Sequence, residues 1–154
     1  MTTASAKSAW KHWIQAGIII LVLTLLDQVS KHLVLTYLKG ENDISLISGV
    51  LQLRYIENRG MAFGLFEGKI PVFVILCLLF FCLFVYVYAR IPRTRYYLPL
   101  AVTSVIMVSG ALGNFIDRVF RGYVVDFIYF SLIDFPVFNM ADIYVVCSGI
   151  LLVL

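Results

Sequence analysis

The sequence predicts an all-α membrane protein of four transmembrane helices, with a small extracytoplasmic β-sheet and a second extracytoplasmic loop. Of its 154 residues, 62% are hydrophobic and 14% are charged, which is too apolar for an ordinary soluble domain. The mean hydropathy of +0.96 points the same way. The segment 71–89 contains no charged residue, and about 20 such residues cross a bilayer core. By its length the chain forms one domain, 1–154.

The first span is expected at 13–36. Its apolar run follows a basic N-terminal stretch, as in a signal peptide, but no small-residue cleavage site comes after it. The apolar pattern continues instead past Asp27 and Lys31, which are four positions apart and can pair on one helix face. The pair either neutralises itself near the helix end or holds the polar end of the span in place, and both interpretations stay open.

The next two spans are predicted at 71–89 and 98–116. A short basic turn, 90–95, separates them, and its Pro92 ends the preceding helix. The 98–116 span contains small side chains that allow a neighbouring helix to approach closely: Ser109, Gly110, Ala111 and Gly113. The fourth span, 141–154, is short for a full crossing. Either it tilts or thins the bilayer, or the natural chain continues, and we favour the second.

Two segments, 39–70 and 117–140, are too polar to span. In the first, 51–55 alternates apolar and polar residues, which is typical of a half-buried strand. A turn is expected at Asn58-Arg-Gly60, followed by Met61-Ala-Phe-Gly64. The second segment is rich in aromatic residues, which favour the depth of the membrane interface.

Charge is distributed unevenly between the two sides. Four spans place both termini and the 90–95 turn together, and that side carries five basic residues and no acid: Lys7, Lys11, Arg90, Arg93 and Arg95. The nine acidic residues lie at the other side. The positive-inside rule therefore predicts that both termini lie in the cytoplasm. A polar site among the acids would lie near the outer leaflet.

Several kinds of chemistry are disfavoured. The chain has only two histidines, His12 and His32, and it lacks a Gly-x-Ser-x-Gly elbow and a His-Glu-x-x-His motif, so serine–histidine and zinc chemistry are not expected. The three cysteines, Cys77, Cys82 and Cys147, lie within apolar runs and are expected to act as small hydrophobic residues. A nucleic-acid partner is not expected, because the sequence contains no basic run or basic–aromatic patch.

Asp126 and Asp142 are the candidate reactive pair. Asp142 stands at the expected start of the fourth span, where it could be a plain helix cap. Asp126 interrupts an aromatic run with no helix end to serve, so it is harder to explain by structure alone. Two aspartates held close together share a proton, and such a pair can take a proton from water and donate one to a peptide carbonyl. The hypothesis is a pair that cuts a peptide bond at the membrane surface.

Polar residues that could assist this pair follow a helical spacing. Asn114, Asp117 and Arg118 lie on one face at the outer end of the third span. Asp117 and Arg118 could form only an ion pair. Alternatively, Asn114 and Arg118 hold a substrate backbone or polarise its carbonyl, and spacing alone does not decide between these.

Together these motifs resemble the lipoprotein signal peptidases (signal peptidase II) of bacteria. The resemblance covers nearly the whole chain and rests on five pieces in order: Asp27-x-x-x-Lys31, Asn58-x-Gly60-x-Ala-Phe-Gly64, Gly110-Ala-Leu-Gly-Asn114-x-x-Asp117-Arg118, Val125-Asp126-Phe127 and Phe138-Asn139-x-Ala141-Asp142. The chain departs from the family at Ser109, Met61 and Met140, and it lacks a basic tail.

The resemblance implies an aspartic endopeptidase of the bacterial inner membrane that cuts prolipoproteins before a diacylglyceryl-modified cysteine and uses no metal or cofactor. It implies that Asp126 and Asp142 are catalytic. A substrate groove would be shaped by Asn58, Asn114, Arg118, Asn139 and Ala141, with support from Asp27, Lys31, Gly60 and Asp117. The implied partners are prolipoproteins, membrane lipids and globomycin-type inhibitors, and we expect a monomer.

The residues alone leave two rivals from other classes. A small transporter or proton channel would use its membrane acids as a proton relay, but it predicts acids at mid-membrane depth or on both sides. A non-enzymatic assembly subunit would use the carboxylates only as caps and ion pairs. Cleavage of a diacylglyceryl-modified precursor, with and without globomycin, separates the three.

Overall fold

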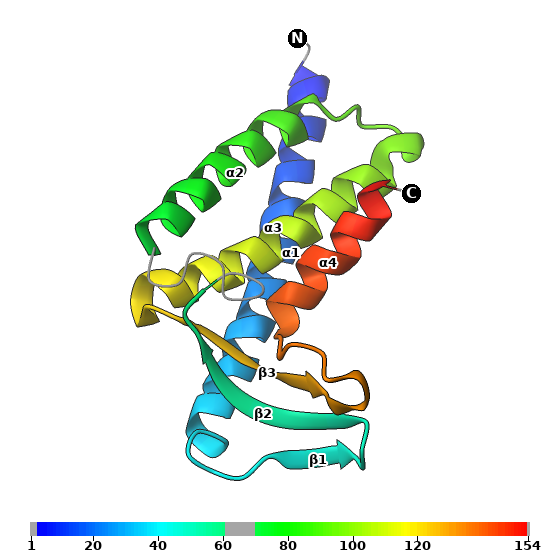
Figure 1. Cartoon of the computed structure of the whole chain (residues 1–154). Helices are drawn as coiled ribbons and strands as arrows, with labels where there is room; N and C mark the ends of the chain where they lie inside the picture. Colours follow the sequence, from blue (N-terminus) through cyan, green and yellow to red (C-terminus); the bar gives the residue numbers. More distant parts are fainter. Residues whose placement is uncertain (1–2, 61–69, 154) are drawn as a thin grey trace.

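The computed structural model describes residues 3–60 and 70–153, and four helices dominate it (Figure 1). They are α1 (Thr3–Tyr37), α2 (Ile70–Arg90), α3 (Leu98–Arg121) and α4 (Met140–Val153). The two termini and the turn between α2 and α3 lie at one end of the helices, and a small sheet lies at the other (Figure 1). The motif Met61-Ala-Phe-Gly64 falls outside the described residues.

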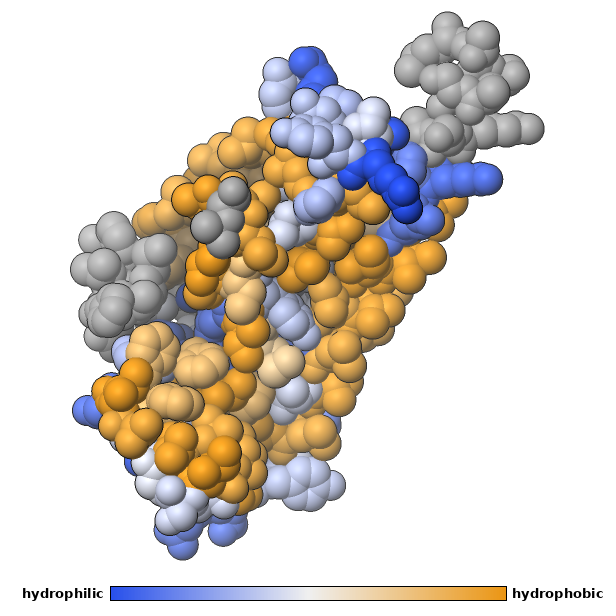
Figure 2. Space-filling model, turned by 90° about the vertical axis from the view of Figure 1, so that its right-hand side faces the viewer, coloured by the Kyte–Doolittle hydropathy of each residue, from blue (hydrophilic) through white to orange (hydrophobic). Residues whose placement is uncertain are grey.

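The helices have the length and composition of membrane spans. Trp10–Tyr37, Pro71–Arg90 and Arg95–Arg121 are each long and apolar enough to cross a bilayer, and Met140–Val153 is apolar but shorter. Large apolar side chains along them are exposed, and Figure 2 shows an apolar surface that continues over much of one flank. The predicted class, a helical membrane protein with a small sheet, is therefore confirmed.

Helix α3 continues beyond the predicted span, 98–116. It ends at Gly122, whose φ of 77° is accessible at little strain only to glycine, and the N–H of Gly122 donates to the carbonyl of Arg118. Asn114, Asp117 and Arg118 all lie on this helix, as their helical spacing predicted, although the predicted span stopped at residue 116. The site residues on α3 are thus held by a regular backbone.

The sheet has three antiparallel strands in the order β1-β2-β3. They are β1 (Ile44–Ile47), β2 (Leu51–Asn58) and β3 (Val124–Phe130). The strand predicted at 51–55 is present and extends to Asn58. The sequence interpretation missed β3, because its aromatic residues were attributed to the membrane interface. A register shift between Leu53 and Ile56 places Ile56 opposite Asp126.

Two apolar clusters hold this arrangement together. Near the sheet, Val34 of α1 and Leu38 directly after this helix pack against Val125 and Phe127 of β3. At the opposite end, a cluster around Tyr88 joins α1, α2 and α3. The first cluster fixes β3 against the end of α1, and this contact determines where Asp126 lies.

The small residues of α3 permit close packing, as predicted. A Cβ at Gly110 would come within 2.9 Å of the Val145 side chain and 3.0 Å of the Tyr144 Cβ, and it would overlap the Ala141 carbonyl. Ser109 is buried, and its carbonyl accepts a hydrogen bond from Thr24 of α1 at 3.3 Å. Successive residues of α3 therefore contact α4 and α1.

We predict that Gly110→Ala lowers the free energy of unfolding by about 1–3 kcal/mol, the usual result of overpacking. The new methyl group meets backbone, which cannot rotate away. Gly17→Ala is the matched control, because no atom lies within 4 Å of a Cβ built there. Thermal unfolding of the purified protein in detergent measures both variants, and equal melting temperatures would show that α3 and α4 are not in close contact.

Candidate active site

The start of α4 is held by a reciprocal pair of hydrogen bonds. The N–H of Asp142 donates to the Asn139 side-chain oxygen at 3.0 Å, and the N–H of Asn139 donates to the Asp142 carboxylate at 3.1 Å. This is a capping box, with an acid three positions after the cap. The capping role considered for Asp142 is therefore real, and it occupies one carboxylate oxygen.

Asn139 also joins Asp142 to Asp126. Its side-chain amide donates to Asp126 at 2.6 Å, while Asn58 of β2 donates to the other Asp126 oxygen at 2.8 Å. The chain reverses between β3 and α4 through two hydrogen bonds that join Ile128 and Phe138, and this reversal brings Asn139 beside Asp126. The two candidate aspartates thus bind the same residue.

Asn114 of α3 supports the pair from the other side. Its amide donates to Asp142 at 2.8 Å, and its oxygen accepts from the Asn139 amide at 3.1 Å and from Lys31 at 2.9 Å. The amide orientation is thereby determined, because each end faces a partner of the required kind.

Lys31 is fully buried between two carboxylates. Its ammonium group lies 2.9 Å from Asp27 and 3.0 Å from Asp117, and neither aspartate side chain is exposed. A buried charge requires such pairing. The sequence predicted the Asp27–Lys31 pair. It did not predict that Asp117 pairs with Lys31, having considered Arg118 instead.

Each of these supporting carboxylates also binds a backbone group next to a candidate aspartate. Asp27 accepts a hydrogen bond from the N–H of Ala141, the residue before Asp142, at 3.0 Å. Asp117 accepts one from the N–H of Val125, the residue before Asp126, at 3.2 Å. The Lys31 cluster therefore positions both aspartates through their backbones.

Two supporting residues escaped the sequence interpretation. Gln28 donates to the carbonyl of Gly113 at 3.1 Å and to Asp117 at 3.2 Å, and Arg121 binds both Asp117 and Gln28. The i,i+4 spacing of Asp117 and Arg121 was the one signal that could have identified part of this group.

A cavity of about 460 Å³ opens beside the aspartates. Five of its lining residues are polar: Asn58, Asn114, Arg118, Asp126 and Asp142. The apolar part of the lining comes mainly from α4 and the loop before it: Phe135, Pro136, Val137, Phe138, Ile143, Val146 and Cys147. The cavity therefore suits an amphiphilic molecule.

Of the remaining predicted site residues, some line the cavity and others do not. Arg118 lines the cavity, donates to the carbonyls of Asn114 and Gly60 at 3.2 and 3.3 Å, and lies 4.5 Å from the Phe73 ring. Ala141 and Asn139 are fully buried and lie behind the cavity lining described. Their observed contacts hold the site together.

Burial changes the acidity of Asp126, which is 2% exposed. Loss of solvent, and then the nearby charge of Asp142, raise the pKa of Asp126 to about 7, although Asn58, Asn139 and Lys31 oppose the rise. A carboxyl group with such a pKa can hold a proton at neutral pH. Two carboxyl groups at one cavity can then differ in protonation, which acid–base chemistry needs.

The fold and the site define an integral membrane protein with two acidic side chains at one polar cavity. Residues 19–154 match the family model described as signal peptidase (SPase) II. The chain belongs to the signal peptidase II family, and it is therefore a membrane peptidase.

Relatives of known name agree. Proteins named lipoprotein signal peptidase are 38% identical in Clostridium novyi, over 88% of this chain and 92% of theirs, and 44% identical in Syntrophomonas wolfei, over 87% of each. A solved structure titled as a bacterial membrane enzyme, determined by the in meso method at 2.3 Å, has a TM-score of 0.82 at 33% identity. It covers 90% of this chain and 85% of its own. A second, at 1.9 Å, has a TM-score of 0.79 at 34% identity and covers 90% of each.

We predict that Lys31→Met lowers the free energy of unfolding by about 3–5 kcal/mol, because it leaves the buried Asp27 without its cation and Asp117 with Arg121 alone. Lys39→Met is the control. Lys39 pairs with Glu57 at 3.0 Å, but both side chains are partly exposed, and solvent screens such pairs. Melting temperatures in detergent should fall strongly for the first variant and hardly at all for the second. Similar values for the two would contradict a structural role for the buried cluster.

Proposed function

We propose that this protein is an aspartic endopeptidase that removes signal peptides from prolipoproteins, cutting before a diacylglyceryl-modified cysteine. The observation that carries the proposal is that Asp126 and Asp142 bind one asparagine and line one cavity. The relatives are named for lipoprotein substrates. The two carboxyl groups in the cavity lining support an aspartic mechanism.

The pair divides the chemistry. Asp142 accepts a proton from a water molecule, and the resulting hydroxide attacks the peptide carbonyl carbon. Asp126, which holds a proton near neutral pH, donates it to the carbonyl oxygen as the tetrahedral intermediate forms. The proton that Asp142 has gained then passes to the leaving nitrogen as the C–N bond breaks, while one hydroxyl group of the intermediate returns a proton to Asp126. Both aspartates thereby regain their starting protonation states.

The cavity walls match the two parts of such a substrate. The apolar wall of Ile143, Val146 and Phe135 suits the acyl chains of a diacylglyceryl group, which then stay out of water. Arg118 belongs to the polar part of the lining, and its guanidinium group is suited to bind a substrate carbonyl. Asn114 is held too firmly by its three partners to turn freely, so we assign it to orienting Asp142.

A lipid-modified substrate arrives by diffusion within the bilayer. The positive-inside rule places the helix end that carries the sheet, and hence Asp126 and Asp142, at the outer leaflet. The acids that the structure describes support a peptidase over a proton channel, because none of them lies in 1–26 or 68–116, the segments that lead to the opposite end. The buried Asp27 and Asp117 are both paired with Lys31, and Asp117 is also paired with Arg121.

Asp126→Asn and Asp142→Asn should each reduce cleavage of a diacylglyceryl-modified precursor by about 10²–10⁴-fold or more, since each removes a proton-transfer group. Both variants should still fold, because asparagine keeps the shape and one oxygen acceptor. Asp43→Asn, which alters an exposed acid paired with Arg54, should leave cleavage unchanged. Substantial activity in either of the first two would remove that residue from the pair.

The proton on the pair should be visible without substrate. In infrared difference spectra, a protonated carboxyl band should disappear with a midpoint near pH 7 and be missing in Asp126→Asn. In Asp142→Asn the midpoint should move to lower pH, because a neighbouring negative charge no longer disfavours ionisation. Cleavage by the unaltered protein should fall as the pH rises through this midpoint. An unchanged midpoint in Asp142→Asn would show that the two groups do not interact.

A further inference from the structure

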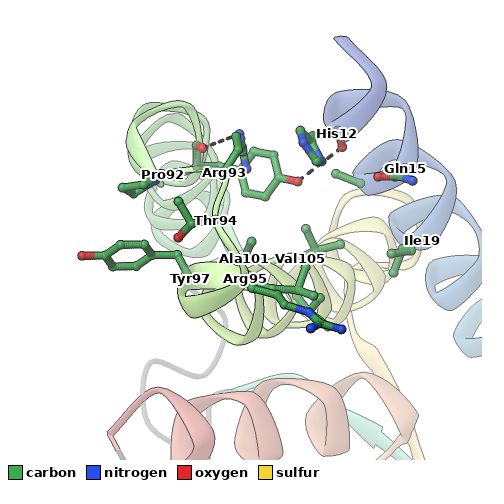
Figure 3. A pocket seen from close by; sticks show the side chains of 14 residues that line it. His12, Gln15, Ile19, Pro92, Arg93, Thr94, Arg95, Tyr97, Ala101 and Val105 are labelled. Carbon is green, nitrogen blue, oxygen red and sulfur yellow. Dashed lines mark hydrogen bonds between the residues drawn. The ribbon is translucent and has the colours of Figure 1, made fainter. Parts of the chain in front are cut away.

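A second cavity, of about 270 Å³, lies at the end of the helices away from the aspartates. Figure 3 shows His12, Gln15 and Ile19 of α1 on one side of it and the turn of Pro92, Arg93 and Thr94 on the other. Helix α3 closes it with Ala101 and Val105 (Figure 3). It shares no lining residue with the candidate active site.

The rim of this cavity is cationic without acidic partners. Arg93 and Arg95 both line it and are exposed. Arg93 donates to the carbonyl of Tyr88 at 2.8 Å and lies 4.4 Å from the Tyr88 ring, so its charge is held in place but not neutralised. The sequence contains no aspartate or glutamate in 1–26 or 68–116, the segments that build this end. An anion is therefore the complementary ligand.

The floor of the cavity is apolar. Ile19, Ala101 and Val105 line it, and Val105 belongs to the buried cluster that joins α1, α2 and α3. Trp10 and Tyr96 at this end are exposed, as is usual for aromatic side chains at headgroup depth. A cationic rim above an apolar floor at that depth fits a molecule with an anionic head and an acyl chain.

We propose that this cavity binds an anionic phospholipid of the leaflet on the side of the termini. The phosphate contacts Arg93 and Arg95, and the start of an acyl chain lies along Ile19, Ala101 and Val105. A free phosphate ion offers the same head chemistry, but it leaves the apolar floor uncovered. The leaflet follows from the orientation proposed above, whereas the binding itself is independent of the peptidase mechanism.

Native mass spectrometry of the full chain tests this. The protein is titrated in detergent with phosphatidylglycerol or with phosphatidylcholine of the same acyl chains, and separately with inorganic phosphate. Phosphatidylglycerol should bind preferentially. Arg95→Gln should weaken its binding roughly fivefold, the effect of one cation beside an anionic headgroup, and Arg95→Lys should restore it. Arg90→Gln is the matched control, because Arg90 carries the same charge on the same turn but lies on the Tyr86 ring, outside the cavity lining described.

Arg95 is the primary variant because, among the residues described, its side chain makes no hydrogen bond or ion pair, so its removal should not unfold the turn. Circular dichroism and precursor cleavage should both stay unchanged, which separates this result from any failure of the peptidase proposal. Three outcomes overturn the inference. They are equal binding of the two lipids, an equal loss in Arg90→Gln, which would indicate diffuse surface charge, or displacement of lipid by inorganic phosphate at similar concentrations.

Discussion

The buried ammonium group of Lys31 is the interaction on which the site depends. It lies within 3.0 Å of carboxylates from α1 and α3 and donates to the Asn114 oxygen at 2.9 Å. Without that cation, Asp27 and Asp117 would repel each other, and the cost of keeping two carboxylates out of water would remain. The three groups therefore require one another, and they fix α1 against α3 at one depth.

Hydrogen bonds connect this cluster to the two candidate aspartates. Asp27 and Asp117 hold the N–H groups of Ala141 and Val125, and Asn114 reaches Asp142 directly. The arrangement uses hydrogen bonds to charged groups, which are stronger than neutral ones. In the proposed mechanism, Asp126 and Asp142 must stay at fixed positions while their protonation changes. Contacts to their neighbours' backbones meet that need, because those contacts do not depend on the charge of either aspartate.

Much of this could be predicted from the sequence, because several signals are local. Uncharged apolar runs predicted the spans, and the i,i+4 spacing predicted the pairing of Asp27 with Lys31. Glycines in α3 predicted its close contact with α4. The motif order identified the family, and the structure brings Asp126, Asp142, Asn58, Asn114 and Arg118 to one cavity. These predictions needed only spacing along one helix or similarity of short motifs.

What could not be predicted depends on contacts between distant segments. Strand β3 pairs with β2, and the paired residues Asn58 and Val124 are more than sixty positions apart in the sequence. The composition of β3 alone fitted an interfacial loop equally well. Gln28 contacts Arg121 across two helices, and no local pattern links them. Ala141, which the resemblance placed among the groove residues, is outside the cavity lining described, and its N–H donates to Asp27. Such roles depend on which neighbour packs nearest, and tertiary structure alone decides that.

The N-terminal cap of α4 has a consequence for the biosynthesis of the protein. The side chain of Asn139 caps the first turn of α4 and also donates a hydrogen bond to Asp126. A nascent chain that has emerged only as far as β3 carries Asp126 without its reaction partner and without the amide that orients it. The proposed active site therefore assembles only after α4 has entered the membrane. A chain that is still being translated up to β3 would then be inactive toward neighbouring proteins.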